Sequence, residues 1–346
     1  MNPESLAEDR HEEAVKFLAQ IFSVSETAPL LRRDLRHWKY YAPHPFTTGS
    51  RSYVFRDAKG LIAHGGLAPV QFDTLSGPKS SFQFIDWAAG TGSAGAGFLL
   101  FRALWPMADS YLGIGGSDDA RKVMKRVPNM KTVQPMAHFA YPLRPFGQLL
   151  ASRFTWKSPL KWLRAWRWHS ARKRPNLSAW KAVPVARLTN SDAPLLIPAD
   201  RADYTPLRRT PELVNYWLAC PAGKIRAWRL EHNGAAAGIL VLAFLNKEAR
   251  IVDVVLSAPN APLSEAYSLA IDLAARESDA CELSAASSAP PQFRALTAAG
   301  FVIRGHSDVF LGDPRKHFPP DVPIEANLTI GDGFYQQSER PYFHTF

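Results

Sequence analysis

Residues 82–97 read FQFIDWAAGTGSAGAG, and the apolar run FLLFRALWPMADSY follows from Phe98. The part 82–88 is rich in aromatic and apolar residues, which is typical of a strand. The loop after it carries four glycines, at positions 90, 92, 95 and 97. The apolar run beyond the loop predicts a helix. We therefore expect a strand, a glycine loop and a helix in succession.

The glycine loop favours the binding of an anion. Glycine has no Cβ, so backbone amides can approach a phosphate closely, and the positive end of the helix dipole lies at the same place. Tight connections between a strand and a helix also use one or two glycines for packing alone. Four glycines within eight residues favour a ligand.

The pattern around this junction predicts a mixed sheet with helices. In chain order we expect helices at 10–24 and 29–41, an antiparallel hairpin at 52–72, the strand 82–88 with its loop and helix, a strand at 111–116, and a helix capped by Ser117. Because a helix connects them, the strands 82–88 and 111–116 should be parallel.

The same plan returns in the second half of the chain. Residues 224–256 predict a hairpin with its turn at Asn233-Gly234, followed by an apolar strand, and further helices and strands continue to about 311. The junction at 257–262 contains no glycine and two prolines, which lack amide donors. We expect a degenerate structural repeat that does not cradle a pyrophosphate.

The first half resembles the GNAT (GCN5-related N-acetyltransferase) superfamily. The acyl-CoA loop of that family has the pattern Arg/Gln-x-x-Gly-x-Gly/Ala at a strand-to-helix junction, and residues 92–97 match it except at Gly92. The order of elements over 10–140 is also similar, and so is the helix-end sequence AAGF at 298–301 in the second half. The resemblance implies an α/β fold (α+β mixed sheet) of tandem GNAT-like acyl-CoA acyltransferase domains, similar to the FemABX-type transferases.

Three parts of the chain follow from this resemblance. Residues 1–143 would form the GNAT-like domain with the acyl-CoA loop, 144–181 a basic, Trp-rich helical linker, and 182–346 the degenerate GNAT-like domain.

The resemblance implies an acyltransferase that moves an acetyl or acyl group from acetyl-CoA, or another acyl-CoA, to an amine acceptor, either an amino sugar or a peptide-like amine. Asp86, on the strand before the loop, stands where family members often hold the general base. A carboxylate that pairs with an Arg or caps amides is the alternative for Asp86. The coenzyme contacts that the resemblance implies are Trp87, Ala88, Gly92, Ser93, Ala94, Gly95, Ala96 and Gly97.

Two departures from the family pattern leave open an alternative to an acyltransferase: a non-catalytic GNAT-fold protein that binds a ligand or partner. Gly92 replaces the usual Arg or Gln, and Met124 stands where many members have a Tyr general acid. A Rossmann-type dinucleotide-binding oxidoreductase is a further alternative, because 90–95 also satisfy Gly-x-Gly-x-x-Gly. The antiparallel hairpin upstream argues against it, since a dinucleotide fold normally opens with this strand.

The segment Arg144–Lys181 holds ten Lys or Arg residues and no Asp or Glu, which equals the net charge of +10. Five of the ten tryptophans lie between Trp156 and Trp180. The segment could be an interdomain helix with a solvated basic face, or contact an anionic membrane surface or lipid-linked substrate. An acidic saccharide is a further alternative, and nucleic acid is less favoured because neither half shows a nucleic-acid-binding fold.

Composition limits which further classes of protein the chain could belong to. No run of about eighteen apolar residues occurs, and the first thirteen residues are polar and acid-rich, so we expect a cytoplasmic protein, with membrane association through 144–181 as an alternative. Cys220 and Cys281 lack the paired spacing of a zinc site, so we expect no metal.

Overall fold

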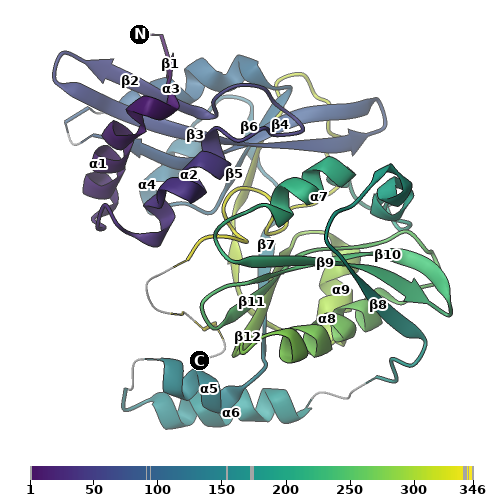
Figure 1. The fold of residues 1–346 in the computed structure, drawn as a ribbon. Helices are drawn as coiled ribbons and strands as arrows, with labels where there is room; N and C mark the ends of the chain where they lie inside the picture. The colour runs from purple at the N-terminus through teal and green to yellow at the C-terminus, as the bar shows by residue number, and fades with distance from the viewer. Residues whose placement is uncertain are drawn as a thin grey trace. The chain divides into compact units, whose positions relative to one another are not determined.

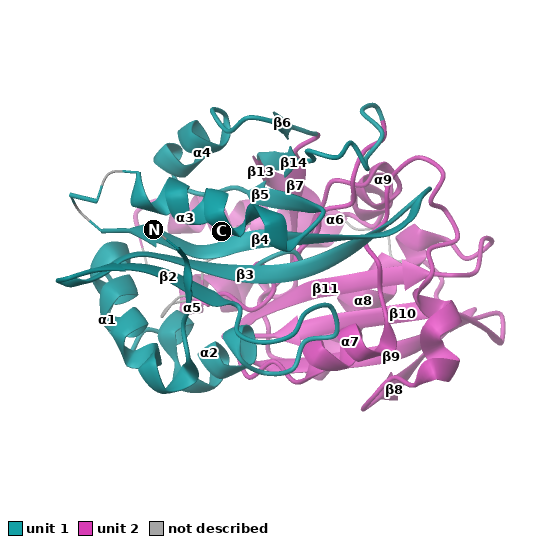
Figure 2. Cartoon of the chain, turned by 90° about the horizontal axis from the view of Figure 1, so that it is seen from above, with its two compact units in different colours: residues 1–133, 308–321, 330–332 teal, residues 134–307, 322–329, 333–346 magenta. Residues whose placement is uncertain are grey.

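The structure is a computed structural model of the 346-residue chain. The residues that it describes are 2–90, 92–93, 95–152, 155–171, 175–337, 341 and 343–344. The chain forms two compact units, each built on one seven-stranded sheet (Figures 1 and 2). Unit 1 comprises residues 1–133, 308–321 and 330–332, and unit 2 comprises 134–307, 322–329 and 333–346.

The sheet of unit 1 has the strand order β1-β2-β3-β4-β5-β14-β6, and only β4 and β5 pair in parallel. Its strands are β1 (Glu4–Ser5), β2 (Ser52–Asp57), β3 (Gly60–Thr74), β4 (Gly77–Ala89), β5 (Ser110–Ile114), β6 (Met130–Thr132) and β14 (Val309–Gly312). Its helices are η1 (Glu8–Arg10), α1 (His11–Phe22), η2 (Pro29–Leu31), α2 (Arg33–Tyr40), α3 (Ala96–Leu104), η3 (Trp105–Met107) and α4 (Asp118–Met124).

The sheet of unit 2 has the order β13-β7-β12-β11-β10-β9-β8, and only β11 and β12 pair in parallel. Its strands are β7 (Met136–Pro142), β8 (Trp180–Val185), β9 (Lys224–His232), β10 (Ala235–Phe244), β11 (Glu248–Leu256), β12 (Glu282–Ser287) and β13 (Val302–Ser307). Its helices are α5 (Pro145–Ala151), α6 (Ser158–Ala171), η4 (Asn190–Leu196), α7 (Pro211–Leu218), α8 (Leu263–Glu277) and α9 (Pro290–Ala298).

The elements expected around the glycine loop are present. The early helices, the antiparallel pair β2-β3 and the parallel pairing of β4 with β5 are confirmed. The Ser117 side chain accepts a hydrogen bond from the Ala120 amide and caps α4, as predicted. Helix α3 begins at Ala96, two residues before the expected start at Phe98.

The two sheets share one strand plan, but each receives a strand from the other half of the chain. Strand β7 follows the first half in sequence, yet it pairs with β12 and β13 of unit 2. Strand β14 is the last strand of the second half, yet it pairs with β5 and β6 of unit 1. The expected first domain, 1–143, therefore differs from unit 1, because the backbone hydrogen bonds of β7 belong to the second sheet and β14 completes the first.

Replacing Gly312 in β14 with alanine tests this exchange. A Cβ at Gly312 would lie 1.8 Å from the ring of Tyr111 in β5, so the ring must move. We expect the variant to lose about 1–3 kcal/mol of unfolding free energy and to lose amide hydrogen-exchange protection in β5 and β6. Gly305→Ala in β13 is the control, because nothing lies within 4 Å of its Cβ position. Unchanged protection of β5 in the Gly312 variant would contradict the pairing.

Candidate functional site

In unit 1, an open strand edge and a glycine loop meet at the end of β4. Strand β4 pairs with β5 only where Ser81–Gln83 face Ser110–Leu112, while its pairing with β3 continues to Ala89. The parallel strands therefore diverge toward their carboxyl ends, where the loop to α3 begins. Ligands of α/β sheets commonly bind beyond the carboxyl ends of strands.

A β-bulge at Asp86 accompanies this divergence. The register between β3 and β4 shifts between His64 and Gly66, and Asp86 has a φ of 48°. Such a left-handed conformation is uncommon for a residue with a side chain and persists only where the surroundings hold it. The bulge directs the Asp86 side chain to α2, while Trp87 contacts the first turn of α3.

The Asp86 carboxylate belongs to a buried ion pair. It accepts hydrogen bonds from the Lys39 ammonium and the Tyr40 hydroxyl, both on α2. The Lys39 and Asp86 side chains are only 5% and 9% exposed. Burial alone would raise the pKa of Asp86, but the Lys39 charge and the two hydrogen bonds outweigh it and lower that pKa. The group is therefore ionised at neutral pH and pairs with a lysine rather than an arginine.

The polar network continues behind Asp86. The Asp86 carbonyl accepts a hydrogen bond from His64 Nδ1 at 2.8 Å, and the Ser52 hydroxyl lies 3.0 Å from His64 Nε2. Burial lowers the pKa of His64, so the neutral ring donates through Nδ1 and accepts from Ser52. The sequence pattern alone did not identify Lys39, Tyr40, Ser52 or His64 as neighbours of Asp86.

The glycine loop combines open positions with packed ones. Gly92 and Gly95 have φ values of 88° and 86°, and nothing lies within 4 Å of either Cβ position. Only glycine adopts this backbone easily, and Gly95 is the N-cap residue of α3. By contrast, the Gly97 carbonyl accepts a hydrogen bond from Trp87 Nε1 at 2.9 Å, so these two residues pack against each other.

The remaining expected coenzyme contacts are distributed around this loop. The Ser93 carbonyl accepts a hydrogen bond from the Ala96 amide at 3.0 Å, which closes the turn before α3. Ala88 is buried among side chains of α1, while Ala96 belongs to the core under α3. Ala94 lies outside the described residues.

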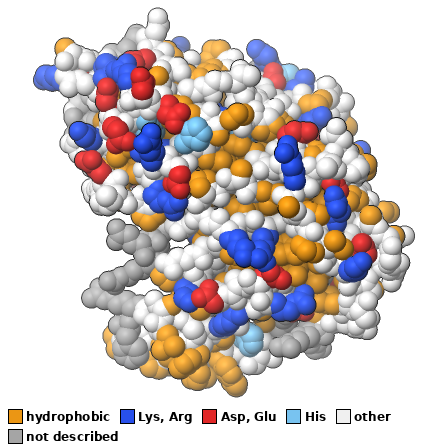
Figure 3. Space-filling model, viewed as in Figure 1, with side chains coloured by type: hydrophobic (Ala, Val, Ile, Leu, Met, Phe, Trp, Pro, Cys, Tyr) orange, Lys and Arg blue, Asp and Glu red, His pale blue; other side chains and the backbone are white. Residues whose placement is uncertain are grey.

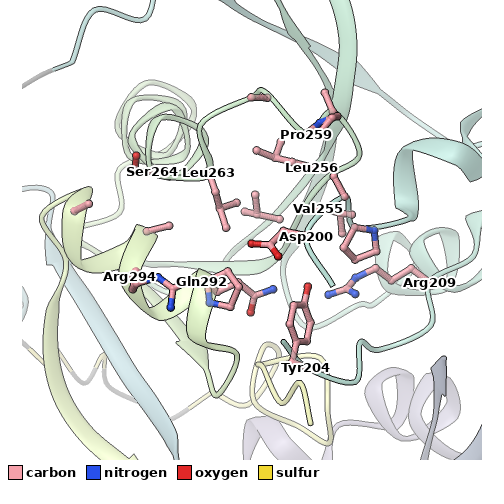
Figure 4. A pocket seen from close by; sticks show the side chains of 18 residues that line it. Asp200, Tyr204, Arg209, Val255, Leu256, Pro259, Leu263, Ser264, Gln292 and Arg294 are labelled. Atoms are coloured by element: carbon pink, nitrogen blue, oxygen red, sulfur yellow. The ribbon is translucent and has the colours of Figure 1, made fainter. Parts of the chain in front are cut away.

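Unit 2 contains a pocket of about 400 Å³ at the corresponding junction. Strands β11 and β12 also diverge, because they pair only at Glu248–Arg250. The pocket lies beside the end of β11 and the starts of α8 and α9, and its apolar wall includes Val255 and Leu263. Figure 4 shows Asp200, Tyr204 and Gln292 directed toward the same space.

The chain itself occupies part of this strand edge. The Ala199 amide donates a hydrogen bond of 2.9 Å to the carbonyl of Leu256 at the end of β11. The loop at 257–262 has no glycine, and Pro259 and Pro262 have no amide hydrogen. Unit 2 therefore offers a pocket with polar side chains rather than a cradle of backbone amides.

A fully buried ion cluster lies beneath the pocket. The Arg209 guanidinium contacts the carboxylates of Asp253 at 2.5 and 3.0 Å and of Glu325 at 2.5 and 3.0 Å. Gln292 and Asn327 donate further hydrogen bonds to these carboxylates. Burial outweighs Arg209 and raises the pKa of Asp253, whereas Arg209 and Gln292 lower the pKa of Glu325.

Substitution of Arg209 by methionine should strongly destabilise unit 2. It leaves two carboxylates buried without their cation, which typically costs about 3–5 kcal/mol of unfolding free energy. Arg226→Met is the matched control, because the Arg226–Glu277 pair is about one-third exposed on both sides and such pairs contribute about 0–1 kcal/mol. Urea unfolding of both variants measures the difference. Similar losses would show that the buried cluster carries no special stability.

Comparison with known proteins identifies the fold. No family model matches the chain, and no curated protein matches it significantly. A GCN5-related N-acetyltransferase from Anabaena variabilis matches with a TM-score of 0.57 at 11% identity, over 90% of this chain and 72% of that one. A tandem GNAT protein from the clavulanic acid biosynthesis pathway gives 0.55 at 12% identity, over 92% and 99%. The N-myristoyltransferase of Saccharomyces cerevisiae gives 0.59 at 12%, over 90% and 80%.

All three neighbours cover most of this chain. The chain therefore has the tandem GNAT fold, and the predicted fold class and resemblance are confirmed.

Proposed function

We propose that this chain, which has the tandem GNAT fold, is an acyltransferase that binds an acyl-CoA at the β4–α3 junction of unit 1. The observation that supports this site is the left-handed pair Gly92 and Gly95, open on the side where a side chain would stand. The N-terminus of α3 adds the positive end of a helix dipole, which favours a pyrophosphate.

The donor in this proposal is acetyl-CoA or another acyl-CoA, and the acceptor is an amine of an amino sugar or a peptide-like molecule. One structural neighbour is an N-acetyltransferase, and another was solved with myristoyl-CoA bound. In the reaction the amine nitrogen attacks the thioester carbonyl, the carbon–sulfur bond breaks, and the CoA sulfur leaves with a proton. The attacking amine must lose a proton, so a base is required.

The proposed site keeps the residues expected from the sequence. Asp86 is the proposed proton acceptor, and Lys39 and Tyr40 would keep its carboxylate ionised. Its lowered pKa makes it a weak base, so activity should persist well below neutral pH. The proposed coenzyme contacts are Trp87, Ala88, Gly92, Ser93, Ala94, Gly95, Ala96 and Gly97.

A second function rests on a different observation. The pocket of unit 2 has the size and the mix of apolar walls and converging polar groups that small-molecule sites show. As the alternative, we propose a non-catalytic GNAT-fold protein that binds a small ligand there. The Asp200 carboxylate and the Tyr204 hydroxyl would select a ligand with hydrogen-bond donors.

Calorimetric titration with acetyl-CoA, with NAD as control, tests the donor site. Gly95→Val should lose about 1–2 kcal/mol of unfolding free energy through its left-handed backbone and should bind acetyl-CoA at least tenfold more weakly. Gly49→Val is the matched control, since Gly49 has a φ of 78° and the same open space. It should lose similar stability and bind acetyl-CoA like the wild type.

Two results of this titration would contradict the proposal. Equal weakening by both valine variants would mean that strain, rather than the loop, lowers the affinity. Failure of the wild type to bind acetyl-CoA would overturn the donor site and favour the ligand-binding alternative. Binding of NAD in its place would favour a dinucleotide site.

The pH dependence of kcat/KM tests Asp86 as the base. Asp86→Asn should lower kcat by about 10²–10⁴-fold and abolish the acidic limb of the profile, measured as CoA release with amino sugars and peptide amines. Lys39→Met removes the cation that lowers the pKa of Asp86. That pKa should rise, and the acidic limb should move to higher pH.

Exposed Lys59→Met serves as the control and should leave the profile unchanged. A purely structural role of the pair predicts another pattern. Both Lys39→Met and Asp86→Asn would then lower the free energy of unfolding, and the acidic limb of the residual activity would stay at the wild-type pH.

A further inference from the structure

Helices α5 and α6 of unit 2 expose an unusual amount of apolar surface. We call the outer surface of these helices, together with Trp156 just before α6, the α5–α6 face. It is defined by six large side chains that are each more than half exposed: Phe146, Leu150, Trp156, Leu160, Leu163 and Trp166. Figure 3 shows hydrophobic side chains gathered at the lower edge of the view, where Figure 1 places these helices. Contiguous exposed apolar surface of this kind usually marks an interaction site.

The opposite side of the helices packs on the rest of unit 2. The α5–α6 face is therefore not needed for the core of unit 2. Ala165 is fully buried, and Trp162 packs with Cys281 and Phe343. Gln148 donates a hydrogen bond of 3.1 Å to Glu282. Trp162 is therefore packed, whereas Trp156 and Trp166 of the α5–α6 face are exposed.

Basic side chains alternate with the apolar residues of this face in the sequence, and no acidic residue lies near it in sequence. Lys157, Lys161, Arg164 and Arg167 lie among its apolar residues, and 144–181 contains no Asp or Glu. The Lys157 ammonium lies 5.0 Å from the centre of the Trp156 ring. The Lys157 charge therefore lies beside an exposed aromatic ring.

We propose that the α5–α6 face binds the surface of an anionic lipid membrane. Leucine and phenylalanine side chains would enter the boundary between headgroups and acyl chains, and tryptophan rings prefer that boundary. Lysine and arginine would reach the lipid phosphates, because their long stems let the charge stay at headgroup level. An anionic membrane surface would therefore bind both the apolar residues and the basic residues of the face.

Other partners satisfy only one of these features. A second copy of the chain would bring two strongly basic segments together, which is repulsive. A nucleic acid would attract the cations, but it would leave the exposed leucines and Phe146 in water.

None of the helices that the structure describes is long and apolar enough to cross a bilayer.

Flotation of the full chain with lipid vesicles tests the proposal. We expect binding to vesicles of phosphatidylcholine mixed with phosphatidylserine, at least tenfold weaker binding to phosphatidylcholine alone, and a loss of binding as salt is raised. Neither an acyl-CoA nor an amine acceptor is present in this assay. The result is therefore independent of the proposed acyl transfer.

Two sets of variants separate the apolar and charged contributions. The apolar set is Leu160→Ser, Leu163→Ser and Trp166→Ser together, and its control is Leu75→Ser, because Leu75 is fully exposed on unit 1. The charge set is Lys157→Gln, Lys161→Gln and Arg167→Gln together, and its control is the triple exchange Lys59→Gln, Lys125→Gln and Arg126→Gln. We expect each set to weaken vesicle binding at least tenfold and each control to bind like the wild type.

Folding and competing partners are checked in parallel. Thermal unfolding followed by circular dichroism must show that each variant melts like the wild type; all substituted side chains are exposed or partly exposed. Equal vesicle binding by the wild type and the apolar set would overturn the proposal. Absence of vesicle binding together with self-association that the apolar set abolishes would assign the face to a second copy. Binding of a DNA oligonucleotide in place of vesicles, lost only in the charge set, would assign it to nucleic acid.

Discussion

The backbone hydrogen bonds of β7 and β14 are the constraint on which both units depend. Strand β7 joins β12 to β13, and β14 joins β5 to β6. A strand edge left without partners exposes amide and carbonyl groups that must be satisfied elsewhere. Each sheet is therefore complete only when the other half of the chain supplies its strand.

The candidate site of unit 1 follows from this arrangement. Strand β14 pairs with one edge of β5. The other edge of β5 can therefore separate from β4 beyond Gln83 while β5 remains part of the sheet. The opening, the bulge at Asp86 and the glycine loop then lie along one short stretch of chain. The buried pair of Asp86 with Lys39 fixes α2 against that stretch, which connects the core of unit 1 to the geometry of the proposed reaction.

The features that could be predicted from the sequence are those set by neighbouring residues. Glycines, prolines and apolar periodicity act over a few residues, so the elements from α1 to α4 and the repeat in the second half could be recognised. The exchange of β7 and β14 could not, because their sequences suit a buried strand in either sheet. The sequence allowed for an ion pair of Asp86 with an arginine, because a buried carboxylate needs a partner, but it did not identify Lys39, which lies 47 residues away in the chain. The unit 2 pocket is assembled from segments far apart in the chain.

The position of β14 also sets the timing of folding during protein synthesis. A ribosome that adds 5–20 residues per second needs about 10–35 s to proceed from β6 to β14. During that interval the facing edges of β5 and β6 have no partner, while the aromatic core beneath them is already synthesised. The nascent first half therefore carries unpaired strand edges until β14 is made, and a chain that ends before β14 would be prone to aggregate.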